Sequence, residues 1–294
     1  MNKNDLVAAL ADQSGLSRAD ATKAVDAIFD VPNGILAAAL KKGDEVRLVG
    51  FGNFVVSARA ASEGRNPLVK DNDIFGNARL FVMQQYRDFL GREGDAGGVT
   101  FFTGQLNSNA LTRAQVTENY FNSAEFQNSV APITRLYLGT YRRIPDTGGL
   151  LFWIGEYRKD LSQANLQRIS TVFATAQEFT STYGNLDNTA FVNKLYELIL
   201  GRPGDAAGVN FWVGQLGNGV SRGVMLSNFT ESDEYKAKTA NDIYVIAIYV
   251  GMLRRAPDQG GFDFWKGRVG SAAARLDLIN GFIGAAEYRS RFLP

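Results

Sequence analysis

The sequence predicts a mainly α protein, in which a small α+β head precedes an all-α array of four repeats. The main observation is a phrase that occurs four times after residue 90: Arg-x-x-Asp-x-x-Gly-x-x-Phe-aromatic-x-Gly. The second observation is that residues 1–67 contain no copy of it. With 45% hydrophobic and 21% charged residues, the 294-residue chain has an ordinary globular composition. Self-similarity at a period of 51–59 residues is typical of stacked repeat architectures.

Two helices are predicted at the start of the head. Asn2 can cap the first, and Ser17 can cap the second, which has Asp20 in its first turn. The apolar positions expected to face inward are Leu6, Ala9 and Leu10, and then Ala21, Val25, Ile28 and Phe29. Pro32 must interrupt the second helix, because proline removes a backbone donor and clashes with the preceding turn. Residues 35–40 resume as helix.

Two strands are predicted next, at residues 46–49 and 54–56, with a glycine-rich connection between them. At this point residues 1–67 resemble the HU family of small bacterial nucleoid proteins. The matching segments are Met1 to Leu6, Lys41 to Val46, Val49 to Phe54, and Gly64-Arg65-Asn66-Pro67. The resemblance implies a dimer whose two β-arms grip the minor groove of DNA. It also implies that Arg59, Arg65 and Asn66 contact DNA, and that Pro67 wedges between base steps and kinks the duplex.

The head departs from this family in two ways. The family continues past the arm tip with a returning strand and a final helix, whereas residues 68–72 lead directly into the repeats. Residues 1–70 also carry nine Lys and Arg against eight Asp and Glu, and a protein that relies on phosphate contacts is normally more basic. Two roles therefore stay open for the head, which are weak, sequence-tolerant DNA binding and the pairing of chains.

The repeats are expected to span residues 72–129, 130–185, 186–238 and 239–294, each with three or four short helices, after a head at residues 1–67. Their structural motif comprises Arg92, Asp95, Arg143, Asp146, Arg202, Asp205, Arg255 and Asp258, with Trp153, Trp212 and Trp265 in the aromatic slot. Each Asp stands where an N-cap belongs, and each Arg can pair with that Asp or tie carbonyls at the preceding helix end. Calcium at the Asp loops is the sharper alternative, but it needs six to eight oxygens and each loop offers one clear carboxylate.

The Phe-aromatic pairs of the phrase have two interpretations. At a recurring helical position we expect them in the core, with each Trp mostly buried. The alternative is a set of platforms on which sugars stack. The segments Leu200 to Gly208 and Phe211-Trp212 resemble a domain-of-unknown-function family found in bacterial surface and secreted proteins. That family is distantly similar to phycobilisome linkers. This resemblance implies an assembly or spacer module with no known catalysis.

The chain contains no Cys and no His, which excludes disulfides, thiol nucleophiles, His general bases and the usual zinc sites. We expect no enzyme activity, cofactor, metal or membrane span. The leading hypothesis is an HU-like DNA-binding or chain-pairing module fused to a helical scaffold that binds itself or another protein, as a homo-oligomer. The polar N-terminus argues against a signal peptide. The resemblance of the head to the HU family implies the cytoplasm and nucleoid. The alternative is a surface-layer or secreted spacer protein, exported without a cleaved signal, whose head no longer binds DNA.

Overall fold

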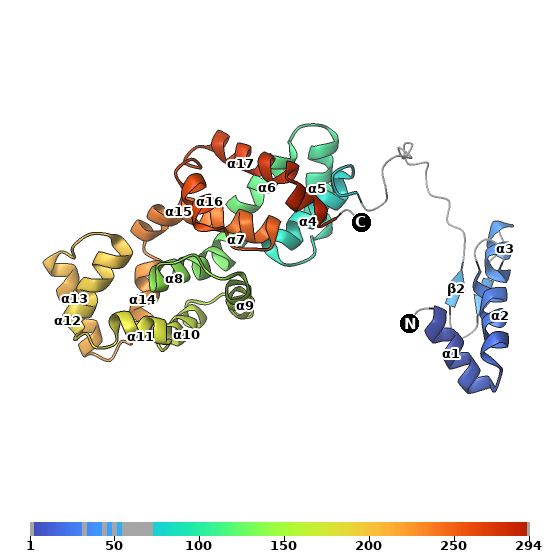
Figure 1. Cartoon of the computed structure of the whole chain (residues 1–294), viewed down its shortest axis with the longest axis horizontal. Coiled ribbons are helices and arrows are strands. Elements are labelled where there is room, and N and C mark those ends of the chain that lie inside the picture. Colours follow the sequence, from blue (N-terminus) through green and yellow to red (C-terminus); the bar gives the residue numbers. More distant parts are fainter. Residues whose placement is uncertain (1–2, 31–33, 43–45, 49–51, 55–72, 293–294) are drawn as a thin grey trace. The chain divides into compact units, whose positions relative to one another are not determined.

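The computed structural model of the chain divides into two compact units, residues 1–67 and 68–294 (Figure 1). It describes residues 3–30, 34–42, 46–48, 52–54 and 73–292. In Figure 1 the first unit is coloured in blue, and the second runs from cyan to red. The two units are described separately.

The first unit contains α1 (Lys3–Ser14), α2 (Arg18–Phe29), α3 (Ile35–Lys41), β1 (Val46–Leu48) and β2 (Gly52–Phe54). Ser17 caps α2 as expected, because its hydroxyl accepts the backbone N–H of Asp20. α2 ends before Pro32, and α3 begins after it. The strands pair antiparallel with Val46 opposite Phe54, so β2 starts two residues earlier than the sequence pattern indicated.

The core of the first unit is small. Val7, Ala21 and Val25 are buried, with Leu6 and Leu10 packed against them. Ile28 and Phe29 were expected on the inner face of the second helix, but they are 40% and 49% exposed. They lie in the last turn of α2, after the buried Val25. Ile35, on α3, is 65% exposed.

The described part of the second unit is all-α. Its helices are α4 (Ala78–Gln85), α5 (Ala96–Asn107), α6 (Arg113–Asn122), α7 (Ala124–Ser129), α8 (Ala131–Tyr141), α9 (Thr147–Arg158), α10 (Gln163–Phe173), α11 (Gln177–Tyr183), α12 (Asn188–Leu195), α13 (Ala206–Gly217), α14 (Arg222–Thr230), α15 (Asp233–Ile248), α16 (Gln259–Lys266), α17 (Ala272–Gly284) and α18 (Ala286–Ser290). Short π-helical segments extend three of them: η1 (Tyr86–Leu90), η2 (Tyr196–Leu200) and η3 (Tyr249–Leu253). Each repeat thus supplies a first helix, a second that starts after the motif Asp, a third, and a fourth, which is short except in the third repeat, where it is the start of α15.

The first helix of each repeat stops in the same way. The terminating residue adopts a left-handed conformation, at Gly91, Arg142, Gly201 and Arg254 with φ of 63, 53, 74 and 58°. Glycine adopts this conformation without a steric cost, whereas the two arginines adopt it against their preference. The chain then enters the loop that holds the motif Asp.

The repeats do not form the linear stack that the periodicity predicts. α10 of the second repeat packs on α14 of the third, as sequence neighbours should, but α6 of the first repeat packs on α17 of the fourth. η1 also contacts η3. The continuous helix α15 joins the end of the third repeat to the start of the fourth and contacts α8. The chain therefore folds back, and its first and last repeats form one end of the unit (Figure 1).

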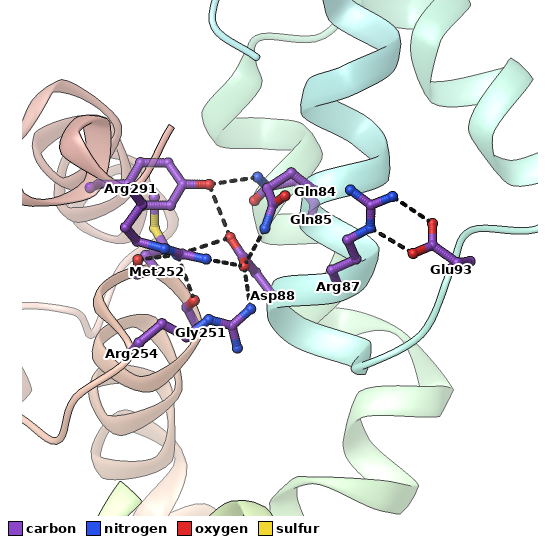
Figure 2. A network of polar contacts seen from close by, with 10 residues as sticks. Gln84, Gln85, Arg87, Asp88, Glu93, Gly251, Met252, Arg254 and Arg291 are labelled. Atoms are coloured by element: carbon purple, nitrogen blue, oxygen red, sulfur yellow. Dashed lines mark hydrogen bonds and ion pairs between the residues drawn. The ribbon is translucent and has the colours of Figure 1, made fainter. Parts of the chain in front are cut away.

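A buried carboxylate joins the first repeat to the fourth (Figure 2). The side chain of Asp88, on η1, is fully buried. It accepts hydrogen bonds from Arg254 at 2.7 Å, from Arg291 at 2.9 Å and from the Tyr288 hydroxyl at 3.0 Å. Gln84 donates a fourth at 2.7 Å. Because burying a carboxylate is costly unless it is paired, this contact specifies the closed arrangement.

Two further ion pairs connect distant repeats. Glu118 on α6 pairs with Arg275 on α17 at 2.8 Å and also accepts the Tyr244 hydroxyl. Arg135 on α8 forms a bidentate pair with Glu231 after α14, at 2.7 Å for both bonds. The first pair strengthens the contact between the first and fourth repeats, and the second ties the second repeat to the third.

We expect Asp88→Asn to lower the free energy of unfolding by about 3 kcal/mol in a urea titration. The substitution leaves Arg254 and Arg291 without their counter-charge, and the loss stays at the low end for a broken buried pair because both keep some contact with water. Glu93→Gln is the control and should change the stability little, since Glu93 and Arg87 form a solvent-exposed ion pair (Figure 2). Equal stability of Asp88→Asn and the wild type would contradict the role of this contact.

Candidate interaction site

The DNA-contacting residues that the sequence predicts, Arg59, Arg65, Asn66 and Pro67, lie outside the described residues. The functional geometry available is that of the repeated phrase. It recurs at equivalent positions in all four repeats, so each of its residues can be assigned a role by comparing the copies.

The motif aspartates are N-caps. Asp95, Asp146, Asp205 and Asp258 precede α5, α9, α13 and α16, and their carboxylates accept the backbone N–H groups of Gly98, Gly149, Gly208 and Gly261 at 2.7–2.9 Å. That bond is the largest cause of the lowered pKa of Asp95, Asp205 and Asp258. The carboxylates are engaged in capping, which agrees with the role expected from their place in the sequence.

The first glycine of the phrase makes room for the tyrosine nine residues before the Asp. A Cβ at Gly149 would lie 2.6 Å from the Tyr137 hydroxyl oxygen, and one at Gly261 would lie 2.6 Å from that of Tyr249. Such an approach is too close for any side chain. This glycine is therefore explained by contacts inside its own repeat.

The motif arginines have a partner that the sequence interpretation missed. Each forms two hydrogen bonds with a glutamate at the start of the repeat's fourth helix: Arg92 with Glu125, Arg143 with Glu178, Arg202 with Glu234, and Arg255 with Glu287. Each also donates to the carbonyl of the next residue, which lies in the loop and not at the helix end where such a contact was expected. The expected pairing with the motif Asp is secondary, since Arg92 and Asp95 are 3.9 Å apart. The signal in the sequence was the Glu-aromatic pair that closes every repeat.

The two residues of each Phe-aromatic pair differ in burial. Trp153, Trp212 and Trp265 are half-buried and pack against the core, with Trp212 5.6 Å from Phe229 between ring centroids. The expectation of a core position is wrong for the preceding Phe in all four repeats. Phe101, Phe152, Phe211 and Phe264 are 58, 58, 55 and 48% exposed. Successive residues lie about 100° apart around a helix, so resting the Trp on the core turns the Phe outward.

The last glycine of the phrase has no such internal explanation. It follows the exposed Phe by three residues and so lies on the same helix face. A Cβ at Gly104, Gly155 or Gly214 would meet nothing within 4 Å. Glycine inside a helix costs about 1 kcal/mol relative to alanine, so each copy carries a cost with no gain within the described fold.

A cleft of about 460 Å³ lies between α7, α8, α15 and α17. Its walls include Arg135, Glu231 and Arg275, which form the ion pairs described above. Desolvation raises the pKa of Tyr244 on its floor, and that hydroxyl is engaged by Glu118. These charged groups thus already have partners, and the cleft presents no acid–base pair or activated nucleophile among its lining residues.

Two searches of the described residues bear on metals and membranes. They contain no cluster of three or more Asp, Glu, His or Cys side chains that could hold a metal ion. None of their helices combines the length and the apolar character needed to span a bilayer.

Comparison with known proteins assigns both parts of the chain. The profile of the family described as Bacterial DNA-binding protein matches residues 1–72. DNA-binding protein HRm of Rhizobium meliloti (strain 1021) is 63% identical over 67 residues, which are 23% of this chain and 70% of that protein. The profile described as Domain of unknown function (DUF4214) matches residues 75–130, 170–239 and 233–292, more than half of the chain. The chain belongs to the HU family of bacterial DNA-binding proteins and to the DUF4214 family.

Other relatives match the same segment of the HU-family head. DNA-binding protein HU of Geobacillus stearothermophilus is 60% identical over 67 residues, covering 23% of this chain and 70% of that protein. DNA-binding protein HU 1 of Bacillus subtilis (strain 168) is 54% identical, covering 23% and 68%. No solved structure matches the chain.

We expect Asp205→Ala to lower the melting temperature. Asp205→Asn should keep most of the stabilisation that the cap provides, because asparagine is an equally good N-cap. The folded-state pKa of Asp205 is depressed, so its contribution is fully present above the unfolded value of about 3.9 and is lost as pH falls through the folded value. The difference in melting temperature between the wild type and Asp205→Ala should be constant above about pH 5 and should become smaller below about pH 4. A calcium-dependent rise in melting temperature, abolished by Asp205→Ala, would assign a metal role instead.

Gly214→Ala should raise the free energy of unfolding by about 0.5–1 kcal/mol, measured by urea titration. The new methyl group meets open space, and alanine is the better helix former with the less flexible unfolded chain. Gly208→Ala is the control and should destabilise, because its Cβ would collide with the Tyr196 hydroxyl. A destabilised Gly214→Ala would show that this glycine serves the fold after all.

Proposed function

We propose that the chain is a non-enzymatic DNA-binding protein in which the HU-family head contacts DNA and the DUF4214 repeats act as an interaction scaffold. The observation that carries the proposal is the match of residues 1–72 to a DNA-binding family, with 63% identity to one protein named for DNA binding. The match includes the arm-tip residues Gly64 to Pro67. Arg59, Arg65 and Asn66 contact the DNA backbone and grooves in this proposal, and Pro67 wedges between base steps.

Pairing of two heads is supported by the exposed apolar surface of the first unit. Ile28, Phe29 and Ile35 are 40–65% exposed, and together they give the head large apolar side chains that its own core does not cover. Burial of such side chains against a second copy would stabilise a dimer. The proposed head is thus an α+β module that binds DNA as a pair.

The charge of the head sets the strength of its DNA binding. With nine basic and eight acidic residues in 1–70, the head neutralises few phosphates. The affinity of a protein for DNA falls with salt in proportion to the phosphates that it neutralises. Binding should therefore be weak and sequence-tolerant, with a shallow dependence on salt. The match of residues 1–72 to a DNA-binding family supports a location at the nucleoid in this proposal.

A second candidate function is a structural spacer or surface-layer protein whose head only pairs chains. It is favoured by one specific observation: the HU-family match covers only 70% of the relative and stops where the repeats begin. The rest of the arm and the final helix of that family have no counterpart in this chain.

Fluorescence anisotropy with a labelled 30-base-pair duplex separates the two candidates. We expect binding at low salt that weakens as salt rises, and a further loss in Arg59→Ala and Arg65→Ala. Lys159→Ala, which removes one exposed positive charge from the repeats, is the matched control and should bind like the wild type. Absence of binding at low salt, with the head folded, would favour the spacer function.

A further inference from the structure

The exposed faces of α5 and α13 are two separate surfaces of nearly the same composition. Around Phe101 and Gly104, α5 exposes Ala96, Gly97, Thr100 and Asn107; around Phe211 and Gly214, α13 exposes Ala206, Ala207, Asn210 and Gly217. Neither helix contains a charged residue, within 96–107 or within 206–217. Each face therefore consists of one aromatic ring among small uncharged residues.

Each face combines a projection with a recess. The Phe side chain projects from the helix, and the glycine three residues later leaves open space beside it. The ring also packs edge-on against its neighbour, at 5.2 Å between centroids for Phe101 and Phe102 and 5.0 Å for Phe211 and Trp212. Two such helices placed antiparallel can each insert a Phe over the glycine of the other, as close helix packing over small residues requires.

The electrostatics of the helix ends favour that antiparallel arrangement. The capping aspartates stand at the N-terminal ends of both helices. In an antiparallel pair of 12-residue helices these carboxylates lie about 18 Å apart, and the positive N-terminal end of each helix dipole lies near the negative C-terminal end of the other. A parallel pair would bring like charges together. The face thus fits a second copy of itself in one orientation.

The two faces lie at opposite ends of the repeat unit. α13 belongs to the end formed by the second and third repeats, and α5 to the end formed by the first and fourth (Figure 1). α9 also pairs an exposed Phe152 with Gly155, but it contains Glu156 and Arg158 and is not one of the uncharged faces. A unit with one uncharged, self-complementary face at each end does not close into a dimer when it associates. It extends into an open chain of copies, because every contact leaves one face free.

We propose that the repeat unit is a two-ended connector, which joins copies of this chain end to end through the Phe–Gly faces of α5 and α13. This deepens the scaffold role proposed above and names its partner as a second copy. Each contact is a single helix face, smaller than a standard interface, so association is weak and depends on concentration. With a DNA-binding head on every copy, such a chain would bridge DNA segments.

The fourth repeat supplies an internal contrast. Phe264 stands at the same position of the phrase, but the Arg268 guanidinium lies 3.6 Å from its ring centroid and covers it. Asp263, next to it in the sequence, is exposed and charged. Two copies of this face would have to bury the charged side chains of Asp263 and Arg268. The face of α16 is therefore not part of the proposed contact.

Sedimentation velocity of the full chain between about 1 and 200 µM tests the proposal. The wild type should grow beyond the dimer that paired heads alone would give. Phe101→Ser with Phe211→Ser should remove that growth, and each single change should weaken it at least about tenfold. Gly104→Gln with Gly214→Gln should do the same by filling the recess, in positions where a side chain meets no atom of the fold. Phe264→Ser is the matched control and should assemble like the wild type.

Three outcomes would overturn the proposal: a wild type that never exceeds a dimer, a Phe101–Phe211 double variant that still assembles, or an equal loss in Phe264→Ser. Binding of a polysaccharide that disappears in the Phe101 and Phe211 variants, without assembly of the wild type, would assign the faces to sugars instead. DNA binding is measured on the same samples. If the double variant no longer assembles but still binds DNA, the two functions are separate. If the wild type assembles but does not bind DNA, the connector proposal stands and the DNA-binding proposal fails.

Discussion

The architecture of the repeat region depends on one buried charge. Asp88 is the only carboxylate among the described residues whose ion-paired side chain is fully removed from water, and its partners Arg254 and Arg291 come from the opposite end of the unit's sequence. A carboxylate in that position is tolerated only when the first and fourth repeats meet. The same contact decides that the four repeats form two pairs, and it thereby places α5 and α13 at opposite ends.

Around that closure, each repeat is built by one set of local contacts. An Asp starts the second helix, a Tyr hydroxyl lies over a glycine, and an Arg joins the loop to the fourth helix through a Glu. The exposed Arg–Glu pairs contribute little individually, but with the backbone contacts they give the loop a single geometry. That geometry sets the rotation of the second helix, and so decides that Trp faces inward and Phe outward.

Local features of this fold could be predicted from sequence, and pairings between distant residues could not. The Ser17 and Asp205 caps follow from residue type and position alone, because capping acts within three residues. The Arg202–Glu234 pair spans 32 residues, and the recurring glutamate marks its position without identifying its partner. The partnership of Asp88 with Arg291 spans 203 residues, and no periodicity marks it. Exposure of Phe211 was missed for a related reason: a recurring aromatic pair indicates that one ring packs inside, but the rotation of the helix decides which one.

The two glycines of the phrase show how to separate what serves the fold from what serves a partner. Gly208 is required by the Tyr196 hydroxyl against it, whereas Gly214 touches nothing that a methyl group would disturb. A glycine that lowers helix stability in α5, α9 and α13, and at which an added Cβ would meet no other atom of the described fold, is explained by a contact outside the fold. The exposed Phe beside it is a second such residue. The projecting Phe of one copy fits the recess that the glycine leaves on another copy, so the surface is complementary to itself.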